Sequence, residues 1–531
     1  MLRALSHLIL VFMLAIPAAA QDSYDVVIRN GKVIDGSGNS WILADVGIRG
    51  DRIVRIGDLS TARAARLIDA KNLVVAPGFI DPHTHAIRGI FKVPTADQVL
   101  LQGVTTLTEG NDGSSPFPIA ENLQKIAGFK ISPNWALYAG QGTIREKVMG
   151  RVNRDATPAE IEKMKQLVAQ AMEEGALGLS TGLFYVPGAF TKTEEVIELA
   201  KIAAKYHGMY ISHMRNEAEG LLDSVRETIR IGEEAGLPVQ MTHHKAAGRD
   251  AWGMSKDSLR MVDEARARGI DITMDQYPYT ASQTGIAALL PQWAQEGQHA
   301  DIVKRLRDAQ TRAKIKNEIV YNILHNRGGG DPKNVFIGSC QWDPSLNGKN
   351  LAEITTARGM PPTPENAAEV TMDIVEKGGA SAIYHAISEE DVERILKHPA
   401  TGIGSDGAIS VFGDAVPHPR EYGTFARVLG HYVRERKVIT LEDAIRKMTS
   451  LTAQRLGIRD RGLLREGFYA DIAVFDPDKI KDMATFEQPH QYAVGMQFVL
   501  VNGQVVVDRG KHTGARPGQI IYGPGYKKSS N

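Results

Sequence analysis

The sequence has a single cysteine, Cys340, among 531 residues. An intramolecular disulfide is therefore impossible, and a zinc site built from several thiolates is excluded, so any such metal would be held by histidines and carboxylates. We expect Cys340 to be a small buried side chain. The 62 basic and 62 acidic side chains leave no excess of either sign. Charge therefore gives no indication of a nucleic acid or an anionic membrane as a partner.

Apolar runs long enough to cross a membrane are also lacking, because a span takes about 20 residues. The run from Leu8 to Ile16 is shorter and lies in a segment typical of a secretory signal. Arg3 precedes the run, and the small residues 18–20 follow it without a cysteine after them. We expect a signal peptide over residues 1–20, cleavage near Ala20, and a secreted or periplasmic protein with no membrane span after the signal is removed.

Short alternating runs at both ends of the mature chain predict β structure. Residues 24–56 contain several such runs, and Asn30-Gly31 between two of them predicts a hairpin turn. Similar runs lie between residues 470 and 507, where Asn502-Gly503 predicts a second hairpin. We therefore predict one small β-sandwich domain formed from residues 21–72 and 451–531.

The middle of the chain repeats a unit of helix, glycine, short apolar strand and polar residue. Four of these strands are expected to end at residues 180, 213, 243 and 275, a spacing of about 30 residues that is typical of parallel βα units. Strands at 73–80, 104–108, 135–139 and 402–405 complete an α/β fold, a TIM-like (β/α)8 barrel over residues 73–450. Residues 282–349 depart from the repeat and predict an inserted lid segment.

Histidines and one aspartate follow these strands, where the active site of such a barrel lies. His83 and His85 alternate in the segment GFIDPHTH, so both imidazoles can point to one place. Two ligands alone do not hold a metal, and incidental histidines in a turn would be an equal alternative. His213, His243 and Asp406 supply three more ligands at other strand ends. The set suffices for one or two divalent ions, and zinc suits these ligand types.

Paired metal ions usually need a bridging anion. The segment TEGNDG after the second strand offers Asp112, with Glu109 as an alternative, whereas the end of the fourth strand has no lysine that could be carboxylated as a bridge. A metal-activated water attacks a carbonyl carbon. Asp406 could then take the proton of this water and pass it to the leaving nitrogen. The pattern therefore predicts amide hydrolysis.

The chain resembles the amidohydrolase superfamily and closely resembles its N-acyl-D-amino-acid deacylases, the D-aminoacylases. The segments that carry the resemblance are GFIDPHTH, GVTTLTEGNDG, GALGLSTGL, SHMRNE, THHK, DQYPY, GSDG and HPREYG. The resemblance implies a barrel with a β-sandwich, zinc, and deacylation of N-acylated D-amino acids. It also implies one metal at His83 and His85, another at His213 and His243, Asp406 as the catalytic acid and base, and a structural His244.

Two positions depart from the family pattern. The family commonly has a bridging cysteine where this chain has Asp112, and we expect the carboxylate to bridge instead. The family often has histidine in the turn after the third strand, where this chain has Gln141, a candidate for substrate contact.

Other substrate contacts are less specific in the sequence. Lys245 or Arg420 could bind a substrate carboxylate, with an internal ion pair as the equal alternative. Tyr277 or Tyr279 could stabilise an oxyanion, and packing of these rings is as good an explanation.

We expect a zinc-dependent hydrolase that converts an N-acyl-D-amino acid to a carboxylate and a free D-amino acid. The nearest alternative is a metallo-dipeptidase of the same fold that acts on short peptides containing D-residues. Cyclic-amide hydrolysis is less favoured because the lysine after the fourth strand is absent. An inactive binding protein is an alternative of another class, supported only by Asp112 in place of cysteine. The sequence gives no oligomeric state, and the preference for D over L substrates rests on the resemblance alone.

Overall fold

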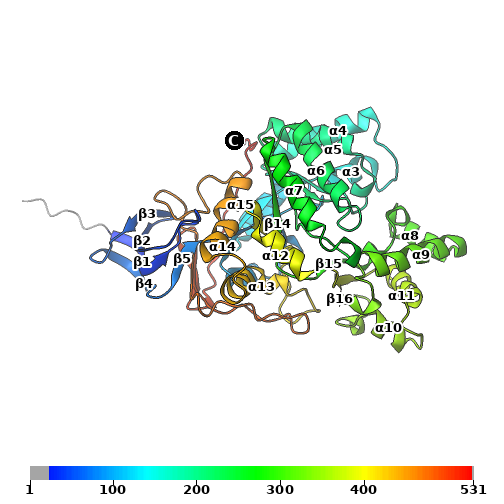
Figure 1. Cartoon of the computed structure of the whole chain (residues 1–531). Helices are drawn as coiled ribbons and strands as arrows, with labels where there is room; N and C mark the ends of the chain where they lie inside the picture. The colour runs from blue at the N-terminus through cyan, green and yellow to red at the C-terminus, as the bar shows by residue number, and fades with distance from the viewer. Residues whose placement is uncertain (1–22, 529–531) are drawn as a thin grey trace, which may run out of the picture.

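The computed structural model describes residues 23–528, so the predicted signal peptide lies outside the described residues. A sheet domain, a central barrel and an inserted subdomain follow one another across the molecule (Figure 1). Each has its own apolar core. This arrangement confirms the predicted fold class. In the part of the chain that the structure describes, no helix combines the length and the hydropathy that a membrane span requires.

The sheet domain joins the two ends of the described chain in one sheet of nine strands. The N-terminal and C-terminal strands meet where β5 pairs antiparallel with β20. Val26, Ile48, Ile472 and Leu500 from both halves share one core. The strands are β1 (Ser23–Val33), β2 (Ile42–Arg49), β3 (Arg52–Gly57), β4 (Arg63–Asp69), β5 (Val74–Pro77), β20 (Ile472–Phe475), β21 (Met496–Val501), β22 (Gln504–Asp508) and β23 (Lys511–His512).

One of the two predicted hairpins is wrong. Asn30-Gly31 lies inside β1, at an irregularity in its pairing with β2. A Cβ on Gly31 would lie 2.4 Å from a methyl carbon of Val75, so glycine is needed there for close packing against β5 and makes no turn. The second hairpin is confirmed, because Asn502 and Gly503, with φ of 48° and 76°, join β21 to β22.

Eight strand positions form the barrel, since β9 and β10 are one strand interrupted at Tyr138. All neighbouring barrel strands that pair do so in parallel. The strands are β6 (Phe79–Asp81), β8 (Val104–Glu109), β9 (Asn134–Leu137), β10 (Ala139–Gly140), β11 (Gly178–Gly182), β12 (Met209–His213), β13 (Val239–Met241), β14 (Ile272–Gln276) and β18 (Thr401–Ile403).

The barrel closes between its first and last strands by a route that the sequence did not predict. The segment expected as the first strand, 73–80, is divided: Val74–Pro77 forms β5 of the sheet domain, and only Phe79–Asp81 enters the barrel. Beyond the ends of β6 and β18, the short strands β7 (Thr84–His85) and β19 (Gly407–Ala408) pair in parallel. The Ser405 N–H also donates to Asp81 Oδ1 at 3.0 Å.

Helices surround the barrel. Thr157 caps α4 with a capping box, because its hydroxyl accepts from the N–H of Glu160 and the Glu160 carboxylate reaches back to the Thr157 N–H. The main helices around the barrel are α2 (Ile119–Phe129), α3 (Gln141–Met149), α4 (Pro158–Glu173), α5 (Thr193–Lys205), α6 (Leu221–Ala235), α7 (Ser255–Ala267), α12 (Glu389–Lys397), α13 (Arg420–Arg427), α14 (Leu441–Met448) and α15 (Ser450–Arg455).

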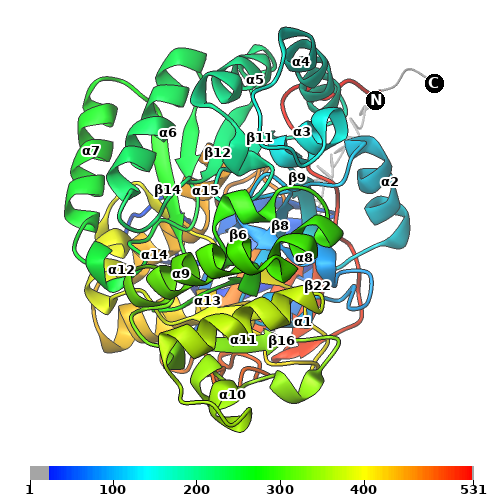
Figure 2. The ribbon, with the colours of Figure 1, turned by 90° about the vertical axis from the view of Figure 1, so that its right-hand side faces the viewer.

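The inserted subdomain is larger than the predicted segment 282–349. Its central strand is β17 (Ser381–Tyr384), which pairs with both β15 (Ser282–Gly285) and β16 (Val335–Ser339). Strands and helices share one core, which includes Cys340 as a buried side chain. The subdomain lies in front of the barrel in Figure 2. Its helices are α8 (His299–Arg307), α9 (Ala309–His325), α10 (Leu351–Ala357) and α11 (Pro364–Glu376).

The C-terminal residues divide between the sheet domain and the barrel, although the sequence placed all of 451–531 in the sandwich. Helix α15 contributes to a barrel-side core that contains Ala453 and Ile211. After β23 the chain returns to the start of β9, where the Trp135 N–H donates to Gln519 O and the Ile521 N–H donates to Trp135 O. The tail therefore covers the end of the barrel opposite the inserted subdomain.

Helix α14 buries Lys447 completely, and its ammonium donates to the carbonyl oxygens of His398 and Thr401. Burial lowers the pKa of Lys447 to about 8 from 10.5. Between these pH values the unfolded chain binds a proton that the folded chain does not, so this group makes the free energy of unfolding rise with pH.

Replacing Lys447 by methionine should remove up to about 3 kcal/mol of this rise. Urea unfolding from pH 7.5 to 10 tests it.

The control for this measurement is Lys397→Met, which removes an exposed lysine from α12. Lys397→Met should keep the pH dependence of the unchanged protein, because the Lys397 side chain is exposed to solvent in the folded protein. Equal pH slopes for Lys447→Met and the unchanged protein would contradict the expectation.

Candidate metal centre and active site

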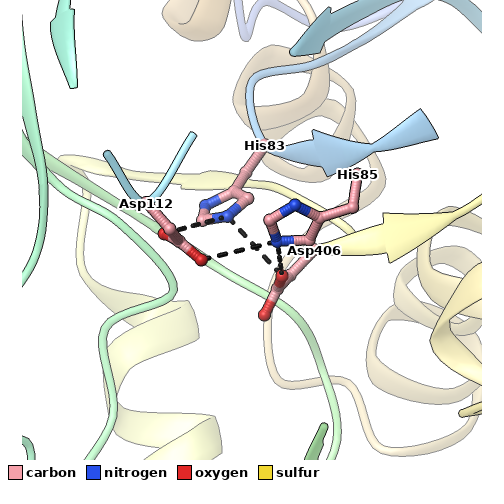
Figure 3. Close-up of side chains that lie close together, drawn as sticks. All are labelled: His83, His85, Asp112 and Asp406. Carbon is pink, nitrogen blue, oxygen red and sulfur yellow. Dashed lines mark ion pairs between the residues drawn. The ribbon is translucent and has the colours of Figure 1, made fainter. Parts of the chain in front are cut away.

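The five ligands predicted at the strand ends, together with Asp112, meet at the carboxyl end of the barrel. Two groups of potential ligand atoms form there, each with all its atoms within 4.8 Å of one another. Figure 3 shows the first group, with the four side chains pointing toward one another. The first group is His83, His85, Asp112 and Asp406, and the second is Asp112, His213 and His243.

The first group has the dimensions of a tetrahedral zinc site. His83 Nε2 lies 3.5 Å from oxygens of both Asp112 and Asp406. His85 Nε2 lies 3.4 Å from Asp112 Oδ2 and 3.1 Å from Asp406 Oδ1. Ligands about 2.1 Å from a zinc ion at tetrahedral corners are about 3.4 Å from one another. The spacing therefore leaves room for one ion between these atoms.

The second group shares Asp112 with the first. His213 Nδ1 and His243 Nε2 each lie 3.6 Å from Asp112 Oδ1. The other oxygen, Oδ2, faces His85, and Oδ1 also lies 3.5 Å from His83 Nε2. A carboxylate whose oxygens face both groups can bridge two ions, as we expected for the residue that stands where the family has cysteine.

Several buried ligand atoms have no hydrogen-bond partner among the described residues. They include both ring nitrogens of His83 and of His213, and Oδ1 of Asp112. Leaving such atoms unsatisfied is costly, so their number at one point indicates a bound cation. Burial lowers the pKa of His213 to about 4, which keeps this imidazole neutral, as a metal ligand must be. Burial also disfavours charge on His83, but Asp112 and Asp406 outweigh it and raise the pKa of His83 to about 10, so a metal ion held between these carboxylates would take the place of that proton. The donor set therefore fits a divalent metal.

Three non-glycine residues at the site have a left-handed backbone. The φ angles are 55° for Asp112, 36° for His243 and 51° for Asp406. Each conformation costs free energy that the surrounding structure must offset. The Asp406 N–H donates to His83 O at 2.8 Å, and the His243 N–H donates to Asp275 Oδ1 at 2.8 Å. These bonds fix the direction in which the two side chains leave the strand ends.

Asp406 is held between the first group and Arg420. Its Oδ2 lies 2.7 Å from Arg420 Nη1, while its Oδ1 faces His85. Burial disfavours the charged carboxylate, but the Arg420 guanidinium and His83 outweigh this effect and keep the pKa of Asp406 well below its usual range. Asp406 is therefore ionised at neutral pH, with one oxygen turned toward the predicted metal.

The remaining predicted site residues lie outside the metal groups. Glu109 accepts from the Ile87 and Gly110 N–H groups, so Asp112 alone is placed to bridge. Gln141 is fully buried, donates to Thr191 Oγ1 and is not among the residues that line the cavity.

Tyr279 and His244, for which the sequence also allowed a structural role, pack inside the protein. The Tyr279 hydroxyl donates to Pro419 O at 3.4 Å, and its ring packs on His418 and Phe486. His244 bonds Ser258 Oγ, in agreement with a structural role.

Lys245 is buried behind His243 rather than free in the cavity. Its ammonium contacts Glu217 Oε1 at 2.5 Å and the His243 carbonyl oxygen at 2.8 Å. The internal ion pair, one of the two readings left open by the sequence, is therefore the one that the geometry favours for Lys245. Arg420 also makes an internal ion pair, with Asp406, and it lines the cavity as well, so both alternatives apply to it.

Sequence reasoning missed Glu217 and Asp275 as parts of the site. Glu217 lies four residues after His213, and Asp275 is the penultimate residue of β14, the seventh barrel strand. Asp275 Oδ1 lies 3.8 Å from His83 Nδ1, on the side of the ring away from Asp112. The signal that could have found both is a carboxylate at or just after a barrel strand that carries ligands.

A cavity of about 880 Å³ opens above the first metal group. Its floor includes His85, Asp112 and Asp406, and Arg420 lies at its edge. The inserted subdomain supplies part of the opposite wall, including Gln283, Thr284, Ser339 and Ser381. The first metal group is therefore reached from solvent through a space with room for a small molecule, and the second group borders this space through Asp112.

Comparison with known proteins agrees with this geometry. A model of the amidohydrolase family matches residues 66–507. D-aminoacylase of Alcaligenes xylosoxydans xylosoxydans is 37% identical over 522 residues, which cover 94% of this chain and 97% of that protein.

Two solved structures share the fold over the same extent. A D-aminoacylase with a binuclear metal centre has a TM-score of 0.79 and 36% identity, and the match covers 94% of this chain and 99% of that one. N-acyl-D-glutamate deacylase from Bordetella bronchiseptica, complexed with zinc and a phosphonate mimic of the tetrahedral intermediate, has a TM-score of 0.80 and 33% identity, with 94% and 100% covered. The chain belongs to the amidohydrolase family and, within it, to the group of D-aminoacylases and N-acyl-D-amino-acid deacylases.

Proposed function

We propose that this protein is a zinc-dependent deacylase that hydrolyses the amide bond of N-acyl-D-amino acids, with release of a carboxylate and a free D-amino acid. The observation that carries the proposal is Asp112, which joins two sets of ligands at the floor of an open cavity. The D-configuration is supported by the relatives, which are D-aminoacylase and N-acyl-D-glutamate deacylase.

His83, His85, Asp112 and Asp406 would hold one ion, and Asp112, His213 and His243 a second. A zinc ion in such a site supplies Lewis acidity, which lowers the pKa of water and polarises a carbonyl oxygen. Two observations support zinc: the donor set consists of imidazole nitrogens and carboxylate oxygens, and the related deacylase is complexed with zinc.

Asp406 would move the proton. Its Oδ1 faces the floor of the cavity, where it can accept a proton from the attacking water and deliver it to the departing nitrogen. Oδ2 stays in contact with Arg420, which fixes the carboxylate plane during both transfers.

Arg420 would also bind the free carboxylate of the substrate. Its Nη2 makes only a long hydrogen bond of 3.4 Å, to Gln283 O, and the residue lines the cavity. A guanidinium in such a place suits a carboxylate, which can accept two parallel bonds from it. The arrangement predicts that a free carboxylate next to the scissile amide is required.

A panel of substrates tests this function. The purified, zinc-supplemented protein would be given matched N-acetyl-D- and N-acetyl-L-amino acids, the corresponding N-acetyl-D-amino-acid amides, and L-D and L-L dipeptides, with amine release as the measurement. We expect turnover of the N-acetyl-D-amino acids, and a value of kcat/KM at least about tenfold lower for the amides, which lack the carboxylate. Turnover of the dipeptides alone would move the function to the dipeptidase alternative.

An inactive binding protein is disfavoured because the four histidines, Asp112 and Asp406 all meet at one point. We also propose export to the periplasm or the exterior, on the sequence pattern of residues 1–20. The N-terminus of the mature protein, measured after expression of the full chain in a Gram-negative host, should begin near Gln21; an intact Met1 would contradict export by a cleaved signal.

A further inference from the structure

Glu217 contacts both histidines of the second metal group. The carboxylate is buried, and it lies just after β12. Its Oε1 is 3.1 Å from His243 Nδ1, and its Oε2 is 3.6 Å from His213 Nε2. In each ring the nitrogen near Glu217 is the one that does not face Asp112. One carboxylate therefore lies beside both imidazoles.

This arrangement decides where the imidazole protons lie. A histidine binds a metal through a nitrogen that carries no proton, so the proton must be on the other nitrogen, and it needs an acceptor. For His243, Glu217 Oε1 lies 3.1 Å from that nitrogen, and Lys245 Nζ also lies 2.8 Å from it. For His213, Oε2 lies 3.6 Å from Nε2, which is too far for a hydrogen bond, so Glu217 acts on this ring through its charge. The negative charge of Glu217 favours a proton on the nitrogen of each ring that faces it, which leaves the nitrogen that faces Asp112 free.

Two cations compensate the buried charge of Glu217. Lys245 contacts Oε1 at 2.5 Å, and Arg327 Nη2 donates to Oε2 at 3.1 Å. Both cations are themselves about 4% exposed. A carboxylate in such a place is held by its ion pairs, because removing one partner leaves charge buried without compensation.

Arg327 and Lys245 belong to different parts of the fold. Lys245 belongs to the barrel loop after β13, whereas Arg327 belongs to the inserted subdomain, between α9 and β16. Its guanidinium lies 4.1 Å from the centre of the Phe184 ring, which follows β11 of the barrel. The stacking and the ion pair together fix one orientation of this side chain.

We propose that Arg327 is a positioning residue: through Glu217 it holds His213 and His243 in the orientation in which they bind the second metal ion. The inserted subdomain then completes the metal centre that it covers. The inference rests on the two-ion site of the proposed function and goes beyond it, since it makes the second ion depend on how the subdomain is docked.

Zinc binding by the full mature chain tests the proposal without any substrate. The metal-free protein would be titrated with zinc in competition with a chelator, and bound zinc would be counted after dialysis. Arg327→Gln should weaken the second zinc about 10- to 100-fold and leave the first unchanged. Arg327→Lys, which keeps the charge, should lose less. Glu217→Gln should resemble Arg327→Gln, because it removes the same link from the barrel side.

Arg312→Gln is the matched control. Arg312 belongs to the same subdomain and pairs with Glu369 and Asp373, away from the metal groups. The Arg312→Gln protein should bind both zinc ions with the affinities of the unchanged protein. Two zinc ions bound with unchanged affinity by Arg327→Gln would overturn the proposal, as would equal weakening of both ions. Failure of the unchanged protein to bind a second zinc would overturn it together with the two-ion site, and the two failures are therefore distinguishable.

Discussion

Replacing Asp406 by asparagine should lower kcat about a thousandfold while zinc remains bound. The amide keeps the size of the side chain but cannot accept the proton of the attacking water, and a general base of this kind contributes about 10² to 10⁴ in rate. His83, His85 and Asp112 still offer three ligands for the first ion. The measurement is kcat on an N-acetyl-D-amino acid together with the zinc content of the same sample.

Loss of the ion pair with Arg420 could also disturb the fold, so the melting temperature of Asp406→Asn belongs in the experiment. Asp263→Asn is a suitable control, because Asp263 is an exposed aspartate of α7 whose partner is His398, outside the cavity. Asp263→Asn should keep full activity. Full activity in a folded, zinc-loaded Asp406→Asn would show that Asp406 does not move the proton.

Replacing Asp112 by asparagine should remove the second zinc ion. A neutral amide cannot bridge, which leaves the second group with His213 and His243 only, and two ligands do not hold zinc. Asparagine is chosen because it tolerates the left-handed backbone of Asp112, whose φ is 55°. We expect zinc content after dialysis to fall from two ions to one, with at least about a hundredfold weaker binding of the second.

Asp112→Cys is the informative counterpart, since a thiolate can bridge two zinc ions. This variant should keep two ions, although cysteine is less well suited to the left-handed backbone and the melting temperature should fall. Two tightly bound zinc ions in Asp112→Asn would mean that the bridge is another group. Loss of both ions in each variant would mean that Asp112 shapes the loop and does not act as a shared ligand.

The positions of the ligands followed from the sequence because a parallel barrel brings the ends of its strands to one place. Each of four ligands lies at the end of a predicted strand, and the fold class alone makes them neighbours, although the first and the last are hundreds of residues apart in the sequence. The four are His83, His213, His243 and Asp406. The same reasoning placed Asp112 near them. It could not choose between Asp112 and Glu109, because that depends on side-chain direction: Glu109 is turned to the Ile87 N–H.

Local patterns failed where a contact distant in sequence outweighed them. Asn30-Gly31 has the composition of a hairpin turn, but Gly31 is required for the close approach of Val75. The apolar run at 73–80 has the composition of one barrel strand, but its first half pairs with β20, almost 400 residues further along the chain. The composition of a segment indicates that the segment is buried, but it does not indicate which other segment it packs against.

The sequence by itself thus determined the architecture, the class of chemistry and the ligands His83, His85, His213, His243 and Asp406, because strand periodicity and ligand type are local properties. Only the tertiary structure decided how these ligands are oriented. Glu217 and Arg327 are 110 residues apart, and nothing in the residues between them signals that a subdomain folds back to bring them together. Their contact exists because two separately packed cores dock across the barrel end, and docking is a property of the assembled surfaces.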